Sequence, residues 1–243
     1  MLSIIKTISL HGLEGCLIEV QVDVSSGIPE WTIVGLPDVS VKEAKERVRT
    51  AIKNSGFEFQ SKKIIVNLAP ANTRKEGSLF DLPIAIGILT NFREIKMQNL
   101  EDTIFVGELS LDGKINKAKG ILPICLEAKK MGIKRIILPK ENEKEAAIVK
   151  DIEVIGIGTL DQLVDYLNDK IEIESTKIDI ENLWKKEQEY NIDFSEIKGQ
   201  KNVKRAVEVA AARWSQLSTY RKSGKWKNND SKKNTNNITR SNL

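Results

Sequence analysis

The sequence predicts an α/β protein on the border of the α+β class, in which an antiparallel β-hairpin joins a sheet built from βα units. Two N-terminal stretches, 3–10 and 14–24, alternate apolar and polar side chains as paired strands do. Later apolar runs alternate with helical patterns about every ten to fifteen residues, which is typical of βα units. Between these parts, a strand at 62–69 leads through a polar loop to a helix that opens at Asp81.

The next predicted elements are a strand at 31–35 and a long amphipathic helix. Ser40 and Glu43 form a capping box at the start of this helix, and Gly56 is placed to end it. Apolar residues recur at helical spacing on one side. The other side carries Lys42, Lys45, Glu46, Arg49 and Lys53. A basic face of this kind can contact a phosphate backbone, but the residue types alone favour a solvated face.

The loop after the strand at 62–69 is the first candidate for a site. Pro70 ends the pairing of the strand, and polar residues continue through Gly77. Asp81 suits the N-cap of the helix that follows, and Pro83 is tolerated in its first turn. Loops between a strand and a helix N-terminus are where α/β proteins place catalytic and binding residues.

The remaining pattern completes the sheet and sets the domain boundaries. Strands are predicted at 102–108, 134–139 and 152–156, a tight turn at 111–114, and helices at 123–131, 142–149 and 159–167. The predicted organisation is an N-terminal domain at 1–168, a polar linker at 169–190 with a short helix near Trp184, a further segment at 191–212 and a tail at 213–243.

The 243 residues have the composition of a soluble globular protein, with 40% hydrophobic and 30% charged residues. No apolar run reaches membrane-spanning length, and the N-terminus lacks the pattern of a signal peptide. Cys16 and Cys125 form no CxxC pair, and His11 has no cluster of ligands beside it. Neither a disulfide framework nor a metal site is therefore indicated. We expect a cytoplasmic protein with no membrane partner and no resident metal.

Charge is unevenly distributed along the chain. Residues 213–243 contain eight Lys or Arg and one acidic residue, a net charge of +7, which leaves −3 of the total of +4 for the first 212 residues. The N-terminal domain therefore shows no general nucleic-acid footprint. The tail is rich in Asn, Lys, Ser and Thr with little to bury, a composition that predicts disorder.

Several short motifs carry a family resemblance. They are Gly35-Leu-Pro-Asp, Asn67-Leu-Ala-Pro-Ala, Lys75-Glu-Gly, Phe80-Asp-Leu-Pro-Ile-Ala and Gly107-Glu-Leu-Ser-Leu-Asp-Gly. In this order they resemble the magnesium-chelatase-like AAA+ ATPases of the YifB/ComM family, over residues 1–212. The resemblance implies a βα sandwich similar to the proteolytic domain of Lon, followed by the start of an AAA+ module. It also implies full-length hexameric motors that use ATP and Mg²⁺ and, in the ComM branch, a role in DNA branch migration during natural transformation.

The resemblance to Lon raises the question of peptidase activity. Lon-type proteases use a Ser-Lys dyad, in which a lysine of lowered pKa takes the proton of the serine hydroxyl. Aligned on the motif that precedes the Lon serine, this chain has Leu79 at the serine position and Ser78 one residue early. The lysine position corresponds to Leu122, and the nearby Lys117 and Lys119 are expected in a loop, where desolvation is weak. The resemblance therefore assigns no catalytic residue here and disfavours a peptidase.

The segment 193–200, followed by a helical pattern at 206–212, resembles the start of the family's AAA+ module. The resemblance places Gly199 and Gln200 on the adenine side of the nucleotide. The phosphate loop that should follow, G-x-x-x-x-G-K-[ST], is missing, and Trp226 stands where a small hydroxyl residue must meet the metal. We therefore expect this chain to bind neither ATP nor Mg²⁺ by itself.

Two origins of the tail remain open. Read one base later with permissible codons, residues 213 onward can encode a complete phosphate loop at the place where the family has one. A Trp codon read in this way always gives glycine, and Trp214 and Trp226 fall where the family needs glycine. The first hypothesis is therefore a shifted reading frame near codon 213. The alternative is a selected basic tail that binds nucleic acid through Lys and Arg, with the two Trp rings stacking on bases.

Two functions from different classes follow from these patterns. One is a truncated member of an ATP-dependent, DNA-linked motor family that keeps the Lon-like domain and has lost ATP hydrolysis. The other is a non-enzymatic binding or assembly module whose basic tail contacts nucleic acid.

Overall fold

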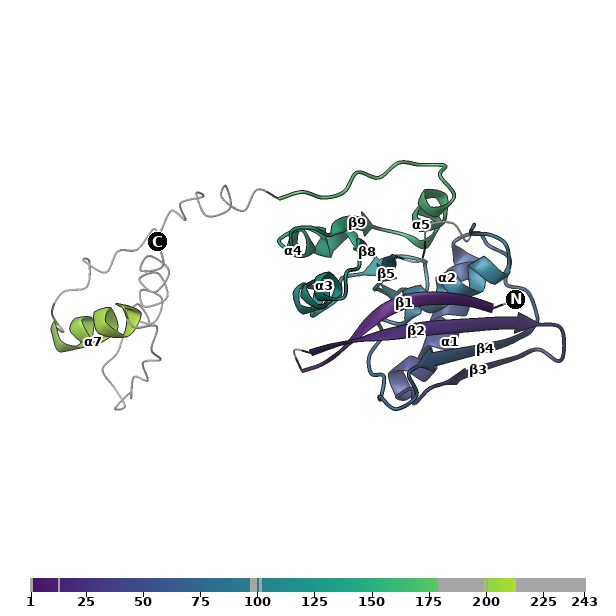
Figure 1. Ribbon diagram of the computed structural model, residues 1–243, viewed down its shortest axis with the longest axis horizontal. Coiled ribbons are helices and arrows are strands. Elements are labelled where there is room, and N and C mark those ends of the chain that lie inside the picture. Colours follow the sequence, from purple (N-terminus) through teal and green to yellow (C-terminus); the bar gives the residue numbers. More distant parts are fainter. Residues whose placement is uncertain are drawn as a thin grey trace. The chain divides into compact units, whose positions relative to one another are not determined.

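A computed structural model describes residues 2–12, 14–96, 100, 102–178, 199 and 201–212. The chain divides into two compact units, Met1–Ile180 and Glu181–Leu243. The first unit contains the sheet and the helices that pack on it (Figure 1). The described part of the second unit is Gly199 and the helix α7, Lys201–Ala212, which covers the helical pattern predicted at 206–212.

The first unit is built on a seven-stranded mixed sheet with the order β3-β4-β2-β1-β5-β8-β9. Its strands are β1 (Leu2–His11), β2 (Glu14–Ser25), β3 (Glu30–Val34), β4 (Lys63–Ala69), β5 (Thr103–Phe105), β8 (Arg135–Pro139) and β9 (Glu153–Ile157). β1 and β2 form the predicted antiparallel hairpin, β3 runs parallel to β4, and β5, β8 and β9 are parallel to one another. The predicted α/β class with an antiparallel N-terminal addition is confirmed.

Helices cover the two faces of this sheet unequally. The helices α1 (Val39–Asn54), α2 (Asp81–Asn91) and α5 (Leu160–Leu167) bury their apolar sides in one cluster on one face. The helices α3 (Ile121–Lys130) and α4 (Glu143–Ala146) pack on the other face, over β5, β8 and β9. In β2 and β4, every second residue is buried while the residues between are more exposed, so this half of the sheet is covered on one face. Figure 1 shows α1 and α2 behind these strands.

The start of α1 corrects the predicted capping box. The N-cap is Asp38, whose Oδ1 accepts a hydrogen bond from Val41 N–H at 2.8 Å. Ser40 lies in the first turn, where its hydroxyl donates to Asp38 at 2.9 Å and accepts from Gly77 N–H at 3.1 Å. A carboxylate at Asp38 is the stronger acceptor for the positive end of the helix, and Ser40 is used by a loop that is distant in sequence.

The start of α2 also differs from expectation. Its N-cap position is Phe80, and Asp81 is the first helical residue. The Asp81 side chain is fully buried and is bound by Arg47, so it does not cap the helix. Pro83 lies in the first turn, as predicted.

Two predicted elements are divided or shortened. The predicted strand at 102–108 is interrupted, because Gly107 N–H leaves the sheet and donates to Leu79 O at 3.3 Å. The next strand, β6 (Glu108–Leu109), pairs with β7 (Ile115–Asn116) around the predicted turn. The predicted helix at 142–149 is a 3-10 turn, η1 (Lys140–Asn142), and the short α4. Asn142 is buried, and its amide group binds the backbone N–H and C=O of Ala118, which sets it apart from the helix.

The two edges of the sheet are finished differently. At β9, the segment after α5 lies along the edge: Thr176 N–H donates to Val154 O at 3.0 Å, and its hydroxyl donates to Glu143 at 2.9 Å. The first unit thus continues beyond residue 168 to Ile180. At β3, no further strand of the described residues pairs with the outer side.

Three predictions fall outside the described residues, namely the short helix near Trp184, the position of Gln200 and the state of the tail at 213–243. None of the helices in the described part of the chain combines the length and the apolar character needed to cross a bilayer.

Candidate functional site

The loop between β4 and α2 is joined to the start of α1. Lys75 N–H donates to Leu36 O at 3.1 Å, and Asp38 N–H donates to Lys75 O at 3.0 Å. Gly35, just before this joint, permits a close approach of the chain to β4, because its φ is +96° and a Cβ there would lie 2.3 Å from Leu68 O. Backbone hydrogen bonds therefore join two motifs that are distant in the sequence, Gly35-Leu-Pro-Asp and Lys75-Glu-Gly.

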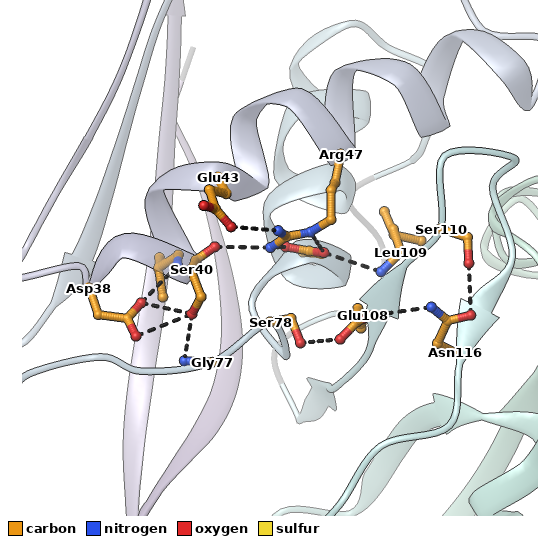
Figure 2. Close-up of polar contacts among 12 residues, drawn as sticks. Asp38, Ser40, Glu43, Arg47, Gly77, Ser78, Glu108, Leu109, Ser110 and Asn116 are labelled. Carbon is orange, nitrogen blue, oxygen red and sulfur yellow. Dashed lines mark hydrogen bonds and ion pairs between the residues drawn. The ribbon is translucent and has the colours of Figure 1, made fainter.

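A buried ion pair joins α1 to α2 (Figure 2). Arg47 Nε lies 2.7 Å from Asp81 Oδ2, and Arg47 Nη2 lies 2.9 Å from Asp81 Oδ1, which is a bidentate geometry. Leu109 N–H of β6 donates to the same carboxylate at 3.3 Å. Burial raises the pKa of Asp81, and the hydrogen bonds from the guanidinium oppose that rise. The hydrogen bond to Asp81 in turn raises the pKa of Arg47. This pair ties three elements together.

A second polar chain lies beside the ion pair and is only partly buried. The Ser78 hydroxyl donates to Glu108 Oε2, and Asn116 Nδ2 donates to Glu108 Oε1 at 3.2 Å. The Ser110 hydroxyl donates to Asn116 Oδ1 at 2.7 Å. Figure 2 shows this chain running from the loop before α2 to the β6-β7 hairpin. The partner of the Ser78 hydroxyl is therefore a carboxylate and not an amine.

The two positions assigned to the dyad by resemblance meet the same apolar cluster. Leu79 and Leu122 both pack against the core between the sheet and α3 and α4. The Leu79 carbonyl is held by Gly107 N–H, and Leu122 N–H donates to Glu145 Oε1 at 3.2 Å. The fold thus fills both positions with aliphatic side chains that pack on one core.

The desolvated lysine of this region is Lys75, whose burial is not predicted from the sequence. Its side chain is fully buried, and its Nζ donates to Pro70 O. Desolvation lowers the pKa of Lys75, while the nearby Cys16 opposes the shift. The amine and the Ser78 hydroxyl bond different partners, so they do not form a hydrogen-bonded pair. Nothing in the sequence marks this burial, because a lysine in a polar loop is ordinarily exposed.

The other candidate side chains offer little reactive chemistry. Burial raises the pKa of Cys125 to about 12, and Glu145 adds to that rise, so the thiol is protonated at neutral pH. Lys117 and Lys119 are exposed in the loop before α3, as predicted. Within the described ranges, no group of three or more His, Cys, Asp or Glu side chains is placed to hold a metal ion.

Several known proteins resemble this chain closely enough to show its family. Residues 20–142 match the family described as subunit ChlI of Mg-chelatase. The chain is 38% identical to the competence protein ComM of Haemophilus influenzae over 212 residues, which is 87% of this chain and 42% of that protein. The chain belongs to the YifB/ComM family of Mg-chelatase-like proteins. The uncharacterized protein YifB of Escherichia coli is also 38% identical over 212 residues, 87% of this chain and 41% of YifB. The chain spans about two fifths of the length of these two relatives.

A more distant relative bears on the ancestry of the YifB/ComM domain. Lon protease 2 of Bacillus subtilis is 27% identical to this chain over 182 residues, which is 67% of the chain and 32% of the protease. This similarity supports the predicted likeness to Lon.

The structure describes only one of the two nucleotide positions carried over from the YifB/ComM family. Gly199 has a φ of +83°, and a Cβ placed on it would meet none of the described residues within 4 Å. Gln200 lies outside the described residues. Of a phosphate loop, only the fragment Ser223-Gly-Lys225 follows α7 in the sequence, and Trp226 takes the hydroxyl position. The sequence after α7 therefore lacks a complete phosphate-binding loop.

Proposed function

We propose that this chain is a non-catalytic binding and assembly domain of the YifB/ComM family that hydrolyses neither ATP nor peptides. The full-length proteins are expected, by resemblance, to be cytoplasmic hexameric motors that use ATP and Mg²⁺ on DNA. In this proposal, the chain contributes a Lon-like domain, whose compact unit extends to Ile180, and the start of the AAA+ module.

The filled dyad positions carry the proposal. A serine nucleophile needs a base within hydrogen-bond reach that takes its proton. Leu79 and Leu122 supply neither group, and both pack on one apolar core. The neighbouring hydroxyl of Ser78 is bound to Glu108, and the only lysine buried in the described part of the chain, Lys75, is bound to Pro70. The candidate site thus has no pair of a nucleophile and an amine within hydrogen-bond reach among the described residues.

The missing phosphate loop supports the proposed lack of ATP hydrolysis. The hypothesis of a shifted reading frame explains the loss, because the alternative frame can restore a loop that ends in Gly-Lys-Thr. Sequencing the gene tests this hypothesis directly. Bases that do not encode that loop in the next frame would refute it.

The activity test compares this chain with a version whose residues from 213 onward are replaced by the shifted-frame sequence and its continuation. We expect no Mg²⁺-dependent ATP turnover from this chain and measurable turnover from the repaired version. A fluorophosphonate probe should label neither protein at Ser78, with Ser78→Ala as the background control. Turnover by this chain, or labelling that Ser78→Ala removes, would contradict the proposal.

Nucleic-acid binding by the tail is a second candidate function, favoured by the net charge of +7 over residues 213–243. Binding through phosphate contacts falls steeply as salt rises. We expect weak, salt-dependent binding of single-stranded DNA by this chain, and a loss of that binding in a chain that ends at Ala212. Equal binding by the two chains would exclude this role for the tail.

A further inference from the structure

We infer that the outer edge of β3 is a docking site for an extended peptide whose side chains alternate between aliphatic and acidic. This inference does not depend on the proposed function. β3 is the last strand on its side of the sheet, and no segment of the described residues pairs with its outer side. The opposite edge is covered, because Thr176 N–H binds Val154 O of β9. An uncovered edge presents backbone N–H and C=O groups that can bind another strand.

The β3 edge lacks the usual protection against pairing. Natural edge strands often carry proline, a bulge or several charges. β3 keeps a regular ladder with β4 over all of its residues, and its charge is limited to Glu30 at the first position. Four large apolar side chains are exposed on or beside this edge: Ile28 (87%) in the loop before β3, Val34 (41%) at its end, Leu36 (55%) in the loop after it and Val39 (72%) at the start of α1. Leu36 also has a φ of +59°, a strained conformation that is kept where structure or function requires it.

The helix-covered side of the same edge is basic. The Arg49 guanidinium lies 5.9 Å from the Trp31 ring centroid and 5.3 Å from the Phe59 ring centroid, so this part of α1 lies over β3. The stripe of α1 at helical spacing from Arg49 consists of Lys42, Lys45, Glu46, Arg49 and Lys53, with a net charge of +3. Trp31 is 8% exposed, and its Nε1 has no hydrogen-bond partner among the residues that the structure describes. This side therefore offers cations, whereas the unpaired Trp31 donor is buried and not open to a partner.

These two sides define the partner, because side chains of a strand point alternately to the two faces of a sheet. A strand added beyond β3 would place one set of side chains on the side of Trp31 and the basic stripe, where carboxylates are complementary. The other set would lie beside the outward row of Glu30, Thr32 and Val34, where an aliphatic side chain can pack on Val34 and an acidic one would be repelled by Glu30. A nucleic acid would use the cations but neither the backbone groups of the edge nor the exposed apolar residues. The geometry therefore favours a peptide.

The test uses a fluorescein-labelled peptide of about ten residues in which Val and Glu alternate. The matched control peptide has the same composition, with all Val residues preceding all Glu residues. We expect fluorescence anisotropy to show binding of the alternating peptide by the full chain and at least about tenfold weaker binding of the block peptide. Hydrogen exchange should slow at those amides of 30–34 that point away from β4 when the alternating peptide is bound, because strand addition pairs them.

Charge reversal on the basic stripe of α1 tests whether acidic side chains of the peptide bind there. Lys45→Glu/Arg49→Glu should weaken binding of the alternating Val–Glu peptide by at least about tenfold and create binding of an alternating Val–Lys peptide. Lys117→Glu/Lys119→Glu makes the same charge change at exposed residues between β7 and α3 and should leave both affinities unchanged. If loss of the Arg49 ring contacts prevents folding, judged by thermal melting, Lys42→Glu/Lys45→Glu makes the same test.

Four results would overturn the inference. They are absence of binding by the alternating peptide, equal binding of the block peptide, unchanged exchange at 30–34 in the saturated complex, and unchanged affinity in the stripe variant. Binding of duplex DNA that the stripe variant loses, with no peptide binding, would identify the stripe as a nucleic-acid surface instead.

Discussion

Two polar centres lie near the start of α2, and they differ in burial and in what they hold. The Arg47–Asp81 pair has a fully buried carboxylate, bidentate geometry and a third bond from β6. The chain from Ser78 through Glu108 to Asn116 is only partly buried. Charges in this region are therefore used to join α1, α2 and β6, whereas the one hydroxyl beside the former nucleophile position is not activated by an amine. The buried pair therefore stabilises the fold, whereas the Ser78 chain lacks the amine that a serine nucleophile would need.

The largest effect is expected from Asp81→Asn, which breaks the buried pair while keeping its shape. Loss of one partner from a buried, hydrogen-bonded pair leaves the other charge unpaired and costs about 3 kcal/mol or more. We expect a fall of about that size in the free energy of unfolding, measured by urea denaturation. The control is Glu43→Gln, because Glu43 is 65% exposed and lies 3.8 Å from the same guanidinium. It should change stability by less than about 0.5 kcal/mol, and a similar loss in both variants would refute a special role for the buried pair.

A double change at the former dyad positions comes next. Leu79→Ser/Leu122→Lys places a hydroxyl and an amine against the apolar core of α3, and we expect a loss of about 2 kcal/mol in urea denaturation. Leu126→Lys is the matched control on the same helix, because Leu126 is 47% exposed and should cost less than about 0.5 kcal/mol. Unchanged stability in the double variant would mean that these positions still tolerate a polar pair.

Much of the framework was predictable from local pattern, and its departures have long-range causes. The period of apolar residues predicts the β1–β2 hairpin and α1, and helix-start and stop residues around apolar runs predict α2 and α3. Local pattern misplaced the cap of α1, because Ser40 is used by Gly77 from another loop. It also misassigned Asp81, whose carboxylate belongs to Arg47, and Asn142, whose amide binds the backbone of Ala118. In each case a partner distant in sequence decides the role.

In the candidate site, too, some features are predictable from the sequence and others depend on partners that are distant in sequence. The resemblance to Lon assigns the dyad positions to Leu79 and Leu122, and the fold packs both residues on one core. The bond from Ser78 to Glu108 depends on how β6 returns to the loop before α2, which no local pattern encodes. The burial of Lys75 likewise depends on the joint with Leu36 and Asp38.

A smaller effect is expected at the cap of α1, where it also depends on pH. Asp38→Ala should lower the free energy of unfolding by about 1 kcal/mol, because the bond to Val41 N–H is lost. Desolvation raises the pKa of Asp38, but the hydrogen bonds from Val41, Ser40 and Gly77 lower it more, so the net shift is below its ordinary value of 3.8. The carboxylate therefore contributes stability that is fully present above pH 3.8 and lost as the pH falls through the lower folded value. Asp38→Asn keeps a capping side chain and should remove only this acid dependence in urea melts at several pH values. A stability curve of Asp38→Asn that falls with acid as the parent's does would contradict the assignment.

The smallest effect is expected from Ser78→Ala, in direct contrast to Asp81→Asn. Glu108 keeps its bond from Asn116 and is only partly buried, so water can replace the lost hydroxyl. We expect the free energy of unfolding to change by less than about 0.5 kcal/mol in urea denaturation. Asn116→Ala, which removes the other donor to Glu108, serves as the comparison and should cost no more than about 1 kcal/mol. A loss of about 2 kcal/mol or more from Ser78→Ala would mean that the hydrogen bond from Ser78 to Glu108 stabilises the fold as a buried bond does, because only an enclosed hydrogen bond carries that much stability.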